Sequence, residues 1–363
     1  MTAATQSLAS LGVSIWLDDL SKDRLTSGSL AHLVETHNVV GVTSNPTIFA
    51  GSVAGSDSYQ DQIATMNSQG VSAEEAVFNI MVADVQGACD LLAPVYEASG
   101  GQDGRVSLEV SPLLARDTEK TVEQAVILSN QVSRPNLMIK IPATKEGLPA
   151  ITQVLAQGIS VNVTLIFSVE RYLEVLDAYH AGIAQAKANG FDPATIFSVA
   201  SFFVSRVDSA VDALLDSLGT KEAAALRSQA GIANARVAYA AFLEDAASHQ
   251  GDGSNLQRPL WASTGVKDPA LPPALYVTEL AAPQTVNTMP EPTLLASGVV
   301  TDPILDNITP HIDHARSVLE KLHDLGIDLA AVTEQLETEG VDKFVVSWRE
   351  LLNTVDHAMR ASG

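Results

Sequence analysis

A lysine lies in the middle of an apolar segment that is typical of a buried strand. Residues 137–143 are LMIKIPA, with Lys140 between two isoleucines. Burying an ammonium group among apolar side chains is unfavourable unless the group is paired or used. Desolvation would lower the pKa of the lysine and supply the neutral amine that attacks a carbonyl carbon. This segment alone leaves two interpretations open, a Schiff-base nucleophile or a lysine that reaches solvent or a structural carboxylate.

Polar residues also end other apolar segments of the chain. Asp18 and Glu109 each end one, while Asn162 and Thr164 stand two apart in SVNVTLIF and so share one face of a strand. Each residue taken alone is typical of a cap or a satisfied hydrogen bond. Together with Lys140 at successive strand ends, they indicate one pocket.

Eight short, β-branched segments alternate with helical patterns such as those over Ala73–Leu92 and Glu170–Asn189. This alternation predicts a parallel sheet, and eight repeats predict closure into a single (β/α)8 TIM barrel. The expected strands are Val13–Leu17, Val39–Thr43, Val106–Glu109, Leu137–Ile141, Ile159–Ile166, Ile196–Phe203, Pro259–Ser263 and Thr285–Met289.

The C-terminal region differs from the rest in having no strand signal. Apolar residues at three and four spacing, among them Val341, Phe344 and Trp348, indicate helices. We therefore expect one domain over residues 1–363, with residues 293–363 mainly helical and on the barrel exterior.

Composition excludes several classes of protein. A net charge of −22 disfavours binding to nucleic acid and to anionic membranes, because both require a basic surface. No 18-residue apolar stretch occurs, residues 1–11 lack the features of a secretory signal, and the single Cys89 cannot form an internal disulfide. These features favour a cytoplasmic protein and leave its oligomeric state open, a homo-oligomer included.

The turn VTSNPTIF after the second expected strand has two explanations. Asn45 is a good helix cap and Pro46 a good first helical residue, which accounts for the spacing without any ligand.

The sequence nevertheless resembles the transaldolases, and most closely their longer bacterial members, over about Asp18 to Pro290. The resemblance implies a Schiff-base enzyme that moves a three-carbon dihydroxyacetone unit between sugar phosphates with no metal and no organic cofactor. It rests on five segments in order: Gly41–Phe49 (GVTSNPTIF), Leu137–Gly147 (LMIKIPATKEG), Val161–Ser168 (VNVTLIFS), Ser201–Asp208 (SFFVSRVD) and Thr285–Pro290 (TVNTMP).

The resemblance also implies catalytic roles for named residues. It identifies Lys140 with the Schiff-base lysine and Asp18 with the proton-shuttling carboxylate, Asp19 being the adjacent rival. Glu109 and Thr164 match the pair that holds a catalytic water.

Substrate contacts follow in the same way. Asn45 and Asn162 match the asparagines that bind substrate hydroxyls, whereas Ser201, Phe203 and Arg206 match positions lining the substrate and phosphate site.

One segment departs from the pattern of the family. Ser263 is a further expected substrate contact. Many members have an arginine close to this serine, whereas residues 262–267 here are ASTGVK. Lys267 is then either a phosphate ligand or a solvated loop lysine. His311, Asp313 and His314 lie close to one another in the sequence, but they fall in a helical pattern after the barrel, where we expect no metal.

Two other functions compete with the transferase. One is the activity of the smaller fructose-6-phosphate aldolases. The resemblance places glutamine and tyrosine in those enzymes at the positions of Glu109 and Phe203, so the residues here favour the transferase. A non-catalytic sugar-phosphate-binding barrel would not need a buried amine at Lys140.

Overall fold

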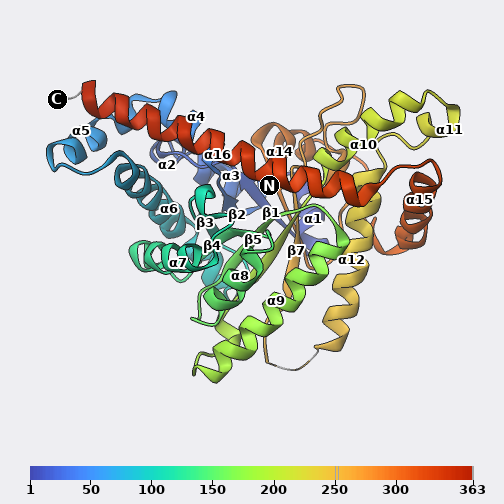
Figure 1. Cartoon of the computed structure of the whole chain (residues 1–363), viewed down its shortest axis with the longest axis horizontal. Coiled ribbons are helices and arrows are strands. Elements are labelled where there is room, and N and C mark those ends of the chain that lie inside the picture. The colour runs from blue at the N-terminus through green and yellow to red at the C-terminus, as the bar shows by residue number, and fades with distance from the viewer. Residues whose placement is uncertain (250, 252, 362–363) are drawn as a thin grey trace.

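The computed structural model describes residues 1–249, 251 and 253–361 and contains a closed barrel of eight parallel strands in the order β1 to β8 (Figure 1). All eight predicted strands are present. Their bounds are β1 Val13–Asp18, β2 Val39–Thr43, β3 Arg105–Glu109, β4 Leu137–Pro142, β5 Val161–Ile166, β6 Ser198–Phe203, β7 Gln257–Ala262 and β8 Thr285–Met289. The TIM barrel expected from the sequence is therefore confirmed.

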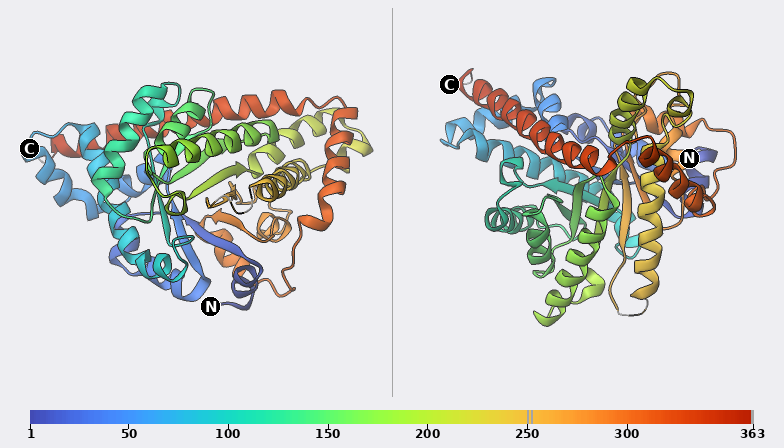
Figure 2. Two further views of the ribbon diagram at one scale, coloured as in Figure 1. Left: turned by 90° about the horizontal axis from the view of Figure 1, so that it is seen from below. Right: turned by 45° about the vertical axis from the view of Figure 1, so that its right-hand side comes forward.

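Helices follow the strands and surround the barrel (Figures 1 and 2). They are α1 Ala3–Leu11, α2 Lys22–Thr26, α3 Ser29–His37, α4 Pro46–Ala54, α5 Gln60–Ser68, α6 Ala73–Ala98, α7 Thr118–Val132, α8 Gly147–Leu155, α9 Val169–Ala188, α10 Ser205–Leu218, α11 Lys221–Ala224, α12 Ala230–Ser248, α13 Leu275–Glu279, α14 Glu291–Gly298, α15 Ile312–Asp324 and α16 Leu329–Ala361. Four 3-10 turns are η1 Asp57–Tyr59, η2 Pro112–Leu114, η3 Pro193–Thr195 and η4 Thr309–His311.

Local chemistry explains where several helices begin. Asn45 accepts a hydrogen bond from the Ile48 amide and Pro46 is the first residue of α4, so the predicted helix start is confirmed. Ser72 and Glu75 form a reciprocal capping box at α6. This helix continues past its predicted end at Leu92 and contains Pro94.

The longest apolar helix is packed within the protein. Among the described helices, only α6 is long and apolar enough to cross a membrane, by length and composition. Most of its apolar window is buried, and the helix packs against β3 and α16. This is the behaviour of a core helix.

The barrel interior is layered. Its middle is apolar, and the buried side chains that fill it include Trp16, Met138, Val199, Leu260 and Val286. In the neighbouring strands β3, β4 and β5, Glu109 is level with Lys140, and Lys140 with Asn162. The register thus brings the polar residues of successive strands to the same end of the barrel.

The longest helix, α16, crosses that end of the barrel (Figures 1 and 2). It packs against α4, α5, α6 and α10 and contacts β5. The Thr47 and Ser347 hydroxyls, 2.8 Å apart, join α4 to α16. The segment after residue 293 is helical as its periodicity predicts, and it also covers the mouth of the barrel.

Gly41 offers a test of the interior packing. A Cβ atom there would lie 2.5 Å from Cε2 of the buried Trp16 ring. We expect Gly41→Ala to lower the free energy of unfolding by about 1 to 3 kcal/mol, the usual cost of overpacking a core. Gly51→Ala is the matched control, because nothing lies within 4 Å of its new Cβ. Denaturant melts showing an equal effect of both changes would contradict this account of the barrel layer.

Candidate active site

A pocket of about 230 Å³ opens at the carboxyl ends of the strands. Nine of the eleven predicted site residues line it: Asp18, Asn45, Lys140, Thr164, Ser201, Phe203, Arg206, Ser263 and Lys267. A larger open hollow of about 550 Å³ lies between α6 and α7, but the charged groups on its wall are exposed side chains such as Glu74 and Lys120. The buried, chemically diverse pocket is therefore the better candidate.

Lys140 forms a buried ion pair at the base of this pocket. Its Nζ lies 2.6 Å from Oε1 of Glu109, and both side chains are less than a tenth exposed. Nζ also donates a hydrogen bond of 2.9 Å to the Ser44 carbonyl oxygen. Burial raises the pKa of the Glu109 carboxyl to about 7, and the charge of Lys140 opposes part of that rise. The lysine is partnered as burial requires, and its partner can exchange a proton near neutral pH.

Glu109 lies just behind the main pocket, in an adjoining cavity of about 20 Å³. Lys140 and Thr164 line both spaces. Oε1 of Glu109 is paired with Lys140, whereas Oε2 of Glu109 and the Thr164 hydroxyl are buried with no hydrogen-bond partner among the described residues. A cavity of this size has room for about one water molecule. The two side chains predicted to hold a water therefore meet around a space that fits one.

The structure separates the two adjacent carboxylates at the end of β1, Asp18 in the strand and Asp19 directly after it. Asp18 Oδ1 accepts a hydrogen bond of 2.7 Å from Thr43, whose hydroxyl is 2.6 Å from that of Thr288. Burial raises the pKa of the Asp18 carboxyl, against the opposing effects of Lys140 and Thr43. Asp19 instead forms an ion pair of 2.5 Å with Arg24. Asp18 is therefore the carboxylate available to the pocket.

The two predicted asparagines differ in position. Asn45 lines the pocket while its Oδ1 caps α4, so the capping role and the site position coexist. Asn162 is fully buried, donates to the Ser107 hydroxyl at 3.0 Å and accepts from Ser201 at 2.7 Å. It does not line the pocket and lies behind Ser201.

Three cations besides Lys140 share the pocket: Arg206, Lys267 and Lys343. The charge of Arg206 is the main cause that lowers the pKa of Lys343, followed by partial burial and Lys267, so the three act on a common space. Arg206 lies over the Phe203 ring, 5.3 Å from its centroid. Asp208 is bonded instead to the Gly231 amide and the Tyr276 hydroxyl. The pairing of Arg206 with Asp208, a structural alternative for this arginine, is therefore absent from the described hydrogen bonds and ion pairs.

Two pocket-side strand ends contain non-glycine residues in the left-handed region. Leu165 has φ of +60° at a shift in the pairing of β5 with β6, and Ser263 has φ of +55°. The predicted end of β7 at Ser263 is wrong by one residue, since the strand ends at Ala262 before this change of conformation. Such strain persists where the surrounding structure enforces it, and it re-aims side chains at functional sites.

Several lining residues were not predicted. Lys343 and Phe344 come from α16, where helical spacing identified Phe344 only as an apolar face residue. Thr43 precedes the predicted helix cap Asn45, and Thr288 lies in β8, whose sequence is TVNTM. The sequence shows Lys343 only as a lysine next to the apolar face of a helix. Exposed helical lysines commonly have this position, so it did not identify Lys343 as a pocket residue.

The fold and the pocket together define a TIM-barrel enzyme with a buried lysine at the carboxyl end of its fourth strand. A family profile described as Transaldolase/Fructose-6-phosphate aldolase matches residues 15–355. The chain belongs to the transaldolase/fructose-6-phosphate aldolase family.

Relatives named transaldolase match the chain over its full length. It is 56% identical to the transaldolase of Thermobifida fusca, with 99% of this chain and 100% of that relative covered. It is 53% identical to the transaldolase of Kocuria rhizophila, with both chains covered in full at 100%. Transaldolase 1 of Streptomyces coelicolor is 55% identical, with 99% of this chain and 96% of that relative covered. Of the two activities in the family description, these names support the transferase.

The buried carboxyl of Glu109 predicts a pH dependence of stability. Its pKa in the folded chain, about 7, lies above the ordinary value of 4.5, so the folded chain binds more protons between these pH values. The contribution of Glu109 to stability is therefore full below about pH 4.5 and is lost as pH rises through about 7.

Glu109→Gln removes this titration. Between about pH 5 and about pH 8, the unfolding free energy of the native chain should fall relative to the variant by up to about 3 kcal/mol. Denaturant melts of both proteins at each pH measure this difference. A difference independent of pH would show that burial does not raise the pKa of Glu109.

Proposed function

We propose that the chain is a transaldolase that transfers a dihydroxyacetone unit from a ketose phosphate to an aldose phosphate through a Schiff base on Lys140. The donor is sedoheptulose 7-phosphate or fructose 6-phosphate, and the acceptor is glyceraldehyde 3-phosphate or erythrose 4-phosphate. The observation that carries the proposal is the buried Lys140 beside Glu109, with Thr164 across a water-sized cavity. The reaction belongs to the non-oxidative pentose phosphate pathway, and we place the enzyme in the cytoplasm, in keeping with its single free Cys89.

Formation of the imine uses the ion pair. Lys140 passes a proton to Glu109, and the neutral amine adds to the ketose carbonyl carbon to give a carbinolamine. Glu109, through a water held with Thr164, returns a proton to the departing hydroxyl, which leaves as water. The raised pKa of Glu109 suits both directions of this exchange near neutral pH.

Cleavage of the carbon–carbon bond uses Asp18. Its carboxylate takes the proton of the hydroxyl next to the bond that breaks, and the electron pair of that bond moves to the protonated imine nitrogen. The first aldose leaves and an enamine stays on Lys140. The enamine attacks the carbonyl carbon of the acceptor, whose oxygen receives the proton from Asp18. Water then hydrolyses the new imine and restores the amine. The lysine nitrogen is the electron sink, so we assign no cofactor and no metal to this chemistry.

The three pocket cations provide the phosphate site. Arg206, Lys267 and Lys343 concentrate positive charge in a chain of net charge −22, which lets an acidic protein bind an anionic sugar phosphate. Asn45 and Ser201 are the proposed contacts of the sugar hydroxyls, with Asn162 holding Ser201. The same net charge disfavours nucleic acid and anionic membranes as partners.

A coupled assay with fructose 6-phosphate tests the function directly. We expect product only when erythrose 4-phosphate is present, because the enamine needs an acceptor to leave the lysine. Glyceraldehyde 3-phosphate released at the same rate without an acceptor would identify an aldolase. Binding of the sugar phosphate with no turnover in either case would identify a non-catalytic barrel.

Arg206→Ala tests the phosphate site. Loss of a charge-assisted contact of about 1.5 to 3 kcal/mol should lower kcat/KM for fructose 6-phosphate by roughly ten- to a hundredfold. The change should fall on KM, because the phosphate is held alike in the ground and transition states. Fructose, which lacks the phosphate, should be affected far less.

Lys343→Met should behave in the same way, and Lys187→Met, which removes an exposed cation of α9, is the matched control. Steady-state kinetics with both donors and a thermal melt of each variant decide the matter. Equal losses for fructose and fructose 6-phosphate would remove the mutated residue from the phosphate site.

A further inference from the structure

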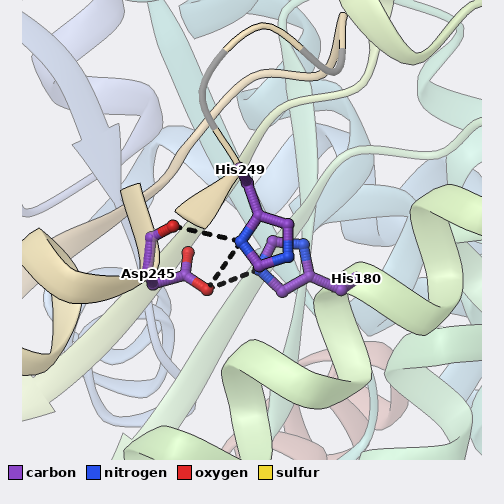
Figure 3. A group of neighbouring side chains, drawn as sticks. All are labelled: His180, Asp245 and His249. Carbon is purple, nitrogen blue, oxygen red and sulfur yellow. Dashed lines mark hydrogen bonds and ion pairs between the residues drawn. The ribbon is translucent and has the colours of Figure 1, made fainter. Parts of the chain in front are cut away.

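We propose that His180, Asp245 and His249 form a binding site for a divalent transition-metal ion, separate from the catalytic pocket. His180 lies in α9, Asp245 in the last turn of α12, and His249 directly after α12 (Figure 3). The C-terminal end of α12 leads into the start of β7, whereas the pocket opens where the strands end. The cluster is therefore at the opposite end of the barrel from Lys140.

The three side chains converge on one carboxylate oxygen. His180 Nε2 lies 2.7 Å from Oδ1 of Asp245 (Figure 3). His249 Nδ1 lies 3.2 Å from the same oxygen and 3.0 Å from the main-chain carbonyl oxygen of Asp245. One donor atom from each residue falls within 4.8 Å of the others. Two nitrogens and one carboxylate oxygen are a usual protein ligand set for zinc, and solvent can complete the coordination.

The helices fix the spacing of these donors. Asp245 and His249 are four residues apart, so they lie on neighbouring turns of one face. α9 packs directly against α12, which brings His180 to that face. The packing of two core-facing helices thus fixes His180 and Asp245, and His249 lies in the turn that ends α12.

The charges around Asp245 favour a cation. Its side chain is only 12% exposed, and in the described part of the chain its ion-pair partners are the two histidines, with no lysine or arginine. The two imidazole rings stack at 3.6 Å between centroids and 15° between planes. A divalent ion bound by the three residues would neutralise the carboxylate of Asp245.

Binding requires a small movement of the rings. A metal ion lies in the plane of each imidazole it binds, so the stacked rings must tilt apart. Bonds of roughly 2.0 to 2.2 Å place the donors of a tetrahedral site roughly 3.3 Å apart. The His249 distance of 3.2 Å is close to that value, whereas the His180 distance of 2.7 Å is that of a hydrogen bond and has to lengthen. His249 follows the last residue of α12 and its side chain is 37% exposed, so its ring can tilt away from that of His180.

The donor types select the ion. Imidazole nitrogen with a carboxylate suits Zn²⁺, Co²⁺, Ni²⁺ and Cu²⁺, whereas Mg²⁺ and Ca²⁺ prefer oxygen ligands. Because the site joins α9 to α12 and is remote from Lys140, its expected effect is to stabilise the fold, not to support the reaction.

Zinc binding to the full, EDTA-treated chain tests the proposal by equilibrium dialysis, with Co²⁺ absorption as a second readout of tetrahedral coordination. We expect one saturable Zn²⁺ per chain and a melting temperature that rises with Zn²⁺. His180→Gln and Asp245→Asn should each weaken binding at least tenfold and abolish the rise. His323→Gln, which removes a histidine with an 89% exposed side chain, should bind as the native chain does.

Melts in EDTA separate metal binding from a purely hydrogen-bonded role of the cluster. If His180→Gln loses the same stability with and without Zn²⁺, the metal site is overturned. Unchanged Zn²⁺ binding in both His180→Gln and Asp245→Asn would also overturn it, as would the absence of saturable Zn²⁺ binding by the native chain.

Discussion

The buried contact between Lys140 and Glu109 is the interaction on which the site depends. Neither charged group would be stable alone in the barrel interior, because apolar neighbours do not compensate for the hydration that the group loses on burial. The parallel register sets Glu109 and Lys140 side by side on β3 and β4, and the 2.6 Å pair follows from that register. The same burial that makes the pair costly raises the pKa of Glu109, which lets a proton move between the two groups.

Closure of the barrel and the long helix α16 supply the rest of the environment. Strand ends bring Asp18, Thr164 and Ser201 to one pocket, and α16 adds Lys343 and Phe344 from more than a hundred residues away in the chain. Net charge and local charge differ in sign here. A chain of charge −22 gathers three cations besides Lys140 at one opening, so the field near the pocket, and not the total charge, decides what binds.

The sequence predicted what local pattern encodes. Periodicity and β-branched residues located all eight strands, and Asn45 before Pro46 located the start of α4. It could not predict that Asn162 lies behind Ser201, because that depends on contacts across three strands. The sequence also could not predict that α16 lies over the pocket or that His180 contacts Asp245. Helical periodicity identifies a buried face but not the element against which that face packs. The turn in direction at Ser263 is enforced by the surrounding fold and has no local signal.

Trapping of the covalent intermediate tests whether Lys140 forms the Schiff base. The chain is incubated with fructose 6-phosphate, reduced with borohydride, digested and mapped by mass spectrometry. We expect one irreversible three-carbon adduct, on Lys140, with Lys267 and Lys343 of the same pocket unmodified. An adduct on another lysine, or none on a chain that still turns over the substrate, would contradict it.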